Sequence, residues 1–151
     1  MRKVALYGTL ATVLAMLAHV LHGISHFEHQ VPLDVWQWAY VIFIVFLAPV
    51  VAAVLLWTRL RLVGAWLLLA SMVGSLIFGL AFHFLISGPD NVFTLNPGAG
   101  REAFVVSVVL VAFTEVLGCV VGVWALSKLP RSAEGAAGMV RPRRGSGEEV
   151  R

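Results

Sequence analysis

The sequence predicts an all-α fold: an integral-membrane four-helix bundle that runs up-down-up-down, with both termini in the cytoplasm and a disordered C-terminal tail. The first observation is composition, because 60% of the 151 residues are hydrophobic and only 13% are charged. A soluble domain is about half apolar and a quarter charged. The second observation is that the apolar residues form four blocks of about 20 residues or more, enough to cross roughly 30 Å of hydrocarbon.

The four predicted spans cover residues 4–24, 35–57, 62–86 and 102–126. They form one membrane domain, residues 1–129, that leaves no room for a separate soluble domain. Residues 130–151 are rich in Gly, Ser, Arg and Glu, which predicts a disordered basic cytoplasmic tail. The first span could instead be a cleaved signal peptide, because Arg2 and Lys3 precede its apolar core. The lack of a clean small-x-small cleavage site favours a retained helix.

The basic residues predict the orientation of the bundle. Arg2 and Lys3 precede the first span, Arg59 and Arg61 lie between the second and third, and six more follow the fourth. Only Arg101 falls on the opposite side. The positive-inside rule therefore places both termini in the cytoplasm of a prokaryotic plasma membrane. The net charge of +3 is explained by these flanks, so we expect anionic lipid headgroups as partners and no nucleic acid.

Residues inside the spans predict how the helices pack. Pro49 in the second span removes a backbone donor and predicts a kink. The other three spans each carry a stripe of small residues, as expected where helices meet in lipid. The ionisable residues lie on the same stripes, which places them inside the bundle. The single cysteine, Cys119, excludes an intramolecular disulfide. A homo-oligomer or a larger membrane complex is compatible with so small a chain.

Four regularly spaced histidines lie at and just beyond the outer end of the first span. His19, His22, His26 and His29 are spaced by three, four and three residues, so they share one helical face. The first and third spans both run outward and lie diagonally across an up-down-up-down bundle. His22 and His83 both lie roughly one helical turn below the outer interface. We therefore expect imidazoles from the two spans to meet.

The histidines predict a site for a transition metal, since neutral imidazole binds zinc, copper and iron. The candidate ligands are the imidazole nitrogens of His19, His22, His26 and His83. A carboxylate from Glu28 or Asp90 is a possible additional ligand. The rival cofactor is haem b, with His22 and His83 as axial ligands. The structural alternative is that each imidazole only bonds a neighbouring carbonyl or hydroxyl group.

Glu115 lies near the middle of the fourth span, where a charged carboxylate is costly. The functional hypothesis is a proton relay beneath the histidines. The alternative is a neutral carboxylic acid that bonds across helices, to Thr12 or Ser75.

In span count alone, the architecture resembles small four-span bacterial membrane proteins, including the DoxX-like group and four-helix membrane cytochromes; this likeness transfers no residue roles. Membrane desaturases fit poorly, because they need more histidines, facing the cytoplasm. The first functional hypothesis is a metal- or haem-binding membrane protein with an outward-facing site, used for redox chemistry or metal handling. The alternatives are an accessory or assembly subunit whose polar residues are structural, and a small proton-coupled transporter. The sequence alone assigns no enzymatic activity.

Overall fold

A computed structural model describes residues 2–129, and all the regular structure in this part of the chain is helical. The elements are α1 (Arg2–Glu28), α2 (Val35–Tyr40), η1 (Val41–Leu47), α3 (Ala48–Leu56), α4 (Arg61–Leu80), η2 (Ala81–Leu85) and α5 (Arg101–Lys128). They join into four helices long and apolar enough to cross a membrane: Arg2–Glu28, Val35–Leu56, Arg61–Leu85 and Arg101–Lys128. The predicted all-helical fold with four apolar helices is confirmed. The tail predicted over 130–151 lies outside the described residues.

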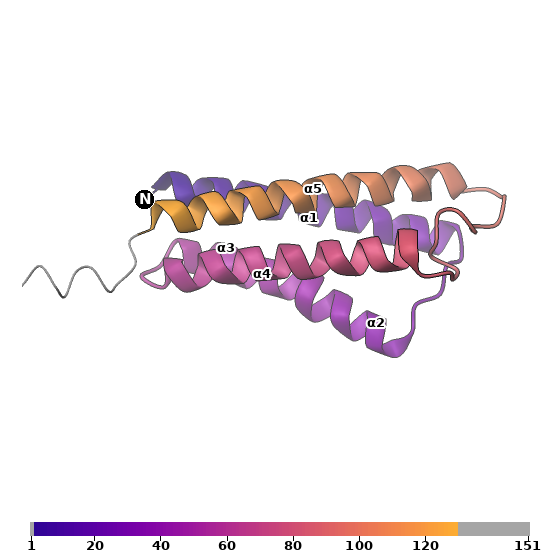
Figure 1. Cartoon of the computed structure of the whole chain (residues 1–151), viewed down its shortest axis with the longest axis horizontal. Helices are drawn as coiled ribbons and strands as arrows, with labels where there is room; N and C mark the ends of the chain where they lie inside the picture. Colours follow the sequence, from indigo (N-terminus) through magenta and orange to yellow (C-terminus); the bar gives the residue numbers. More distant parts are fainter. Residues whose placement is uncertain (1, 130–151) are drawn as a thin grey trace, which may run out of the picture.

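The helices form one bundle in which α1 packs along α5, α5 along α4, and α4 along α3 (Figure 1). α1 and α4 touch only slightly and face each other across the interior. The start of α1, the connection from α3 to α4 and the end of α5 gather at one end of the bundle (Figure 1). The loops over 29–34 and 86–100 gather at the other end. The halves of α1 and α4 nearest to these two loops therefore face each other.

The bundle is apolar on the outside, and its polar residues are buried among the apolar side chains of its interior. Large apolar side chains such as Leu17, Phe113 and Val120 are more than half exposed. The buried polar and charged residues are Thr12, His22, Ser25, Gln37, Ser71, Ser75, His83, Asp90, Asn91, Ser107, Thr114 and Glu115. Polar groups facing inward and apolar groups facing outward are what a bilayer requires of the helices that cross it.

Small residues let the helices approach closely where no polar contact holds them. A Cβ atom on Gly64 would lie 2.9 Å from the backbone oxygen of Ala52, so α3 and α4 are in near backbone contact there. A Cβ atom on Gly118 would lie 2.6 Å from Sδ of Met72. These contacts follow the rule that lipid-embedded helices associate through small residues and van der Waals packing.

Two wide, π-helical turns interrupt the regular helices. In η1 the N–H of Ala48 donates to the carbonyl of Phe43, five residues back, immediately before Pro49. Proline has no N–H to contribute, so a local change in the bonding pattern is expected there. α2 diverges from α4 beyond this point (Figure 1). In η2 the N–H of Ile86 donates to the carbonyl of Ala81 at 2.7 Å, and His83 lies inside this turn. Such turns occur often at functional sites.

Candidate metal centre

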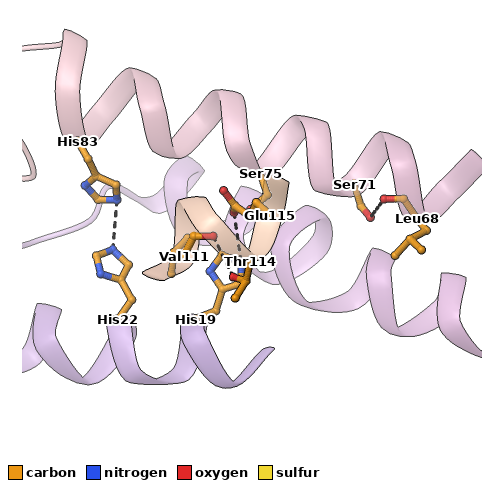
Figure 2. A network of polar contacts seen from close by, with 9 residues as sticks. All are labelled: His19, His22, Leu68, Ser71, Ser75, His83, Val111, Thr114 and Glu115. Atoms are coloured by element: carbon orange, nitrogen blue, oxygen red, sulfur yellow. Dashed lines mark hydrogen bonds and ion pairs between the residues drawn. The ribbon is translucent and has the colours of Figure 1, made fainter. Parts of the chain in front are cut away.

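Three imidazoles meet in the half of the bundle nearest to the two loops. Nε2 of His22 lies 3.2 Å from Nε2 of His83 and 3.1 Å from Nε2 of His26. Figure 2 shows the rings of His22 and His83 pointing toward each other from α1 and η2. One ligand atom from each of the three residues lies within 4.8 Å of the other two, so this group could hold a metal ion. The three are called the histidine cluster below.

Backbone carbonyls fix the proton of two of these rings. Nδ1 of His83 lies 3.0 Å from the carbonyl oxygen of Asp90, and Nδ1 of His26 lies 3.3 Å from that of Val31. A carbonyl oxygen only accepts, so each Nδ1 carries the hydrogen and donates it. In the neutral imidazole the other nitrogen then presents a lone pair. Nε2 of His26 and Nε2 of His83 are therefore acceptors, and both face the cluster.

The hydroxyl of Ser107 contacts the Nδ1 nitrogen of the His22 ring. Ser107 Oγ lies 2.7 Å from the carbonyl oxygen of Phe104, and Ser25 Oγ lies 2.7 Å from that of His22, so each hydroxyl donates its single proton to a carbonyl. Nδ1 of His22 lies 2.9 Å from Ser107 Oγ, whose remaining role is to accept. With the Ser107 proton on the carbonyl of Phe104, Nδ1 of His22 is the donor to Ser107, and its Nε2 also presents a lone pair. Three lone pairs converge on one point.

Phe104 packs against all three rings. Its ring centroid lies 5.0 Å from those of His22 and His26 and 5.7 Å from that of His83. Phe104 is fully buried on α5. It keeps the imidazoles from turning away and shields one side of the cluster from water.

A cavity of about 800 Å³ opens on the other side of the histidine cluster. Asp90 lines it, and its Oδ1 is buried without a hydrogen-bond partner in the described part of the chain. Burial raises the pKa of this loop carboxyl from 3.8 to about 6. Asp90, whose carbonyl contacts His83, thus also carries one buried, unpartnered side-chain oxygen.

A second polar group borders the same cavity one helical turn deeper. Nε2 of His19 lies 3.3 Å from Oε1 of Glu115, and the hydroxyl of Ser75 donates to the same oxygen. Glu115 is fully buried. Figure 2 shows His19, Ser75 and Glu115 converging from α1, α4 and α5. His19 therefore contacts Glu115 and does not belong to the group of three.

The remaining predicted residues lie elsewhere. Glu28 is exposed and borders a smaller, separate pocket formed with the loop over 94–99. Nδ1 of His29 lies 3.0 Å from the carbonyl of Ala99 and ties the end of α1 to that loop. Asp90 contacts the cluster through its backbone carbonyl, whereas the sequence suggests only its side chain.

Sequence reasoning missed the supporting residues Ser25, Ser107 and Phe104. A signal for two of them exists, because Ser107 and Phe104 fall eight and eleven residues before Glu115 and so share its face of α5. Ser25 follows His22 by three residues and shares its face of α1. The carbonyl partners carry no side-chain signal.

Comparisons with protein-family models, with curated proteins and with solved structures were made for this chain. No family model, curated protein or solved structure matches it.

Proposed function

We propose that this chain is a multi-pass protein of a prokaryotic plasma membrane that binds one divalent transition-metal ion through Nε2 of His22, His26 and His83. The bundle runs up-down-up-down with both termini in the cytoplasm, so that the histidine cluster faces outward. The function that follows is redox chemistry or metal handling. The observation that carries the proposal is the convergence of three Nε2 atoms whose rings each donate through Nδ1.

Converging lone pairs repel one another unless a cation lies between them. A hydrogen on Nε2 of His22 would satisfy at most one neighbour well, and it would require the ring to give up its donation to Ser107. A metal ion satisfies all three nitrogens at once. Metal-bound histidines characteristically donate their other N–H to a carbonyl or another acceptor, and every ring of this cluster does so.

The distances agree with tetrahedral coordination. Zinc–nitrogen bonds of about 2.0–2.1 Å place two ligands of a tetrahedron roughly 3.3 Å apart. Two of the three distances between the ligand nitrogens are 3.1 and 3.2 Å, and all three nitrogens lie within 4.8 Å of one another. Imidazole suits zinc, copper and iron, whereas calcium and magnesium prefer oxygen. Three protein ligands leave a fourth position toward the cavity, as in metal sites that react with substrate or water.

Haem b fits this arrangement less well. Axial nitrogens on opposite faces of a haem lie about two metal–ligand bonds apart, roughly 4 Å, with the macrocycle between them. Nε2 of His22 and Nε2 of His83 are 3.2 Å apart, and His26 approaches the same point. Three donors around one point favour an ion.

Asp90 is the proposed carboxylate beside the fourth position. Its buried, unpartnered Oδ1 and its place in the cavity wall support this role. Glu28, the other acidic candidate, is exposed and borders a different pocket. We therefore assign it no role in binding the metal.

Glu115 is proposed as a proton relay between the cavity and the bundle interior. The contacts that support it are those with His19 and Ser75, which form a chain of exchangeable protons at the cavity wall. Intramembrane acids that face other polar groups commonly serve this purpose. The relay is a second role, separate from the ligands of the metal.

The test is metal titration of the purified full-length chain in detergent after removal of bound metal by a chelator. Zn²⁺ and Co²⁺ are the probes, because Co²⁺ reports its geometry by visible absorption. We expect one ion per chain, and at least tenfold weaker binding in His22→Ala, His26→Ala and His83→Ala. His29→Ala is the matched control, since it removes an imidazole from the same helix outside the cluster and retains wild-type affinity. Equal affinity in wild type and His22→Ala, or a haem Soret band in the purified protein, overturns the proposal.

A further inference from the structure

The cavity beside the histidine cluster is far larger than a metal ion needs. Its volume of about 800 Å³ lies in the range of sites for small organic ligands. Its walls come from α1, α2, η1, α4, η2 and α5 and from the loops over 29–34 and 86–100, and they are mainly apolar. The aromatic side chains that line it are Phe27, Trp38, Phe46 and Phe78. Aromatic walls of this kind favour a flat, partly apolar ring by stacking or edge contacts.

The cavity is continuous with the lipid-facing surface of the bundle. Val20, Ile24 and Phe27 line it and are also 50%, 50% and 80% exposed on the outer face of α1. Gly23 lies among them in the cavity wall, and a Cβ atom built there meets nothing within 4 Å. A ligand would therefore reach the cavity sideways from the bilayer, past Gly23.

Two polar groups border this apolar space close to each other. A Cβ atom on Gly79 would lie 3.9 Å from Oε2 of Glu115 and 3.9 Å from Cδ2 of His83. Oε2 of Glu115 and Cδ2 of His83 are therefore no farther apart than twice 3.9 Å, and both lie beside Gly79 of α4. One polar group is the histidine cluster, and the other is His19 with Glu115 and Ser75.

We propose that the cavity binds a lipid-soluble quinone, with its ring along the aromatic wall, one oxygen facing the two polar groups, and its apolar tail directed past Gly23 into the bilayer. A quinone carries polar oxygens on a flat, largely apolar ring, which matches aromatic walls beside two neighbouring polar groups. The apolar tail matches the lateral opening. This inference goes beyond metal binding, because it uses His19, Ser75 and Glu115, which contact no metal ligand atom.

The test is binding of a benzoquinone with a decyl tail to the full-length chain in detergent micelles, followed by quenching of tryptophan fluorescence. Trp38 lines the cavity and is the expected reporter. Wild type should show one saturable site. Gly23→Leu fills the opening and should weaken binding at least tenfold, whereas Gly23→Ala, which adds one methyl group to open space, should bind as wild type does.

Metal titration of the same samples separates this inference from the metal proposal. Gly23→Leu keeps all three histidines, so retained metal affinity shows that the variant is folded. Quenching that never saturates, or that is unchanged in Gly23→Leu, overturns the quinone proposal and leaves the metal site standing. Saturable binding that requires Gly23 in a chain without metal affinity overturns the metal proposal alone. A co-purified phospholipid, identified by mass spectrometry, that the quinone does not displace also overturns the quinone proposal.

Discussion

Nδ1 of His22 lies 2.9 Å from Oγ of Ser107, although 85 residues separate the two in the chain. This contact joins α1 to α5 inside the bundle and decides which nitrogen of His22 faces the cavity. Because the serine hydroxyl already donates to the carbonyl of Phe104, it accepts from His22. A residue that touches no metal thus sets the ligand's tautomer.

Ser107→Ala should lower metal affinity about 10- to 100-fold, since loss of such a supporting partner has an effect of that size. The matched control is Ser127→Ala. Ser127 makes the same bond to its own helix, at 2.7 Å from the carbonyl of Trp124, but is exposed far from the cluster. Competition with a coloured chelator gives the affinities. Equal affinity in the two variants would show that Ser107 does not orient His22.

Gly64→Ala should destabilise the protein more than Gly118→Ala, although the added methyl group meets a closer atom at position 118. At Gly64 the obstacle is the backbone oxygen of Ala52 at 2.9 Å, which moves only if the helices separate. At Gly118 it is the flexible thioether of Met72. Overpacking against backbone costs about 1–3 kcal/mol. Thermal unfolding in detergent measures the difference, and the reverse order would contradict the rigid contact between α3 and α4.

Asp90→Asn should change how stability depends on pH. Burial raises the pKa of Asp90 from 3.8 to about 6, so between these values the folded protein keeps a proton that the unfolded chain has released. Stability therefore falls as the pH rises through this window. Asparagine cannot ionise, so the variant should lose that part of the slope and be relatively more stable above pH 6. Melting temperatures measured with a chelator present provide the test, and parallel curves for the two proteins would refute it.

The predicted orientation has a direct chemical test. In a Cys119→Ser background, Asn96→Cys places a thiol in the exposed part of the long loop, and Leu60→Cys places one at the other end of the bundle. A membrane-impermeant maleimide added to intact cells should label position 96 and spare position 60. Permeabilised cells should label both. Labelling of position 60 alone in intact cells would invert the topology.

The four helices could be predicted from sequence because length and hydropathy alone determine which segments fit a bilayer. The predicted span over 62–86 and the observed helix Arg61–Leu85 differ by one residue at each end. The meeting of His22 with His83 could also be anticipated, because both lie about one turn below the same end of the bundle and their helices lie diagonally.

The grouping of His22 and His26 with His83 could be inferred from depth along the helices, but the contact of His19 with Glu115 could not, because it depends on rotation about each helix axis. His19 and His22 share a face of α1, yet one meets Glu115 and the other meets His83. Hydrogen bonds from the histidine rings to backbone carbonyls also cannot be predicted from a sequence. The carbonyl of Asp90 orients His83, and any residue at position 90 would supply the same group. Such contacts exist only once the loop over 86–100 has folded back on the bundle.

The wide turn Ala81–Leu85 behaves as an insertion of one residue into an otherwise regular helix. Removing one residue from it would restore α-helical bonding and leave the length and hydropathy of the span almost unchanged. A deletion after His83, however, would draw the long loop back along the helix by one residue and shift its carbonyl at Asp90 away from His83. A homologue lacking this single residue would keep the appearance of the same membrane protein while losing the site. The number of residues in this one turn is therefore a sharper marker of shared function than the four apolar spans.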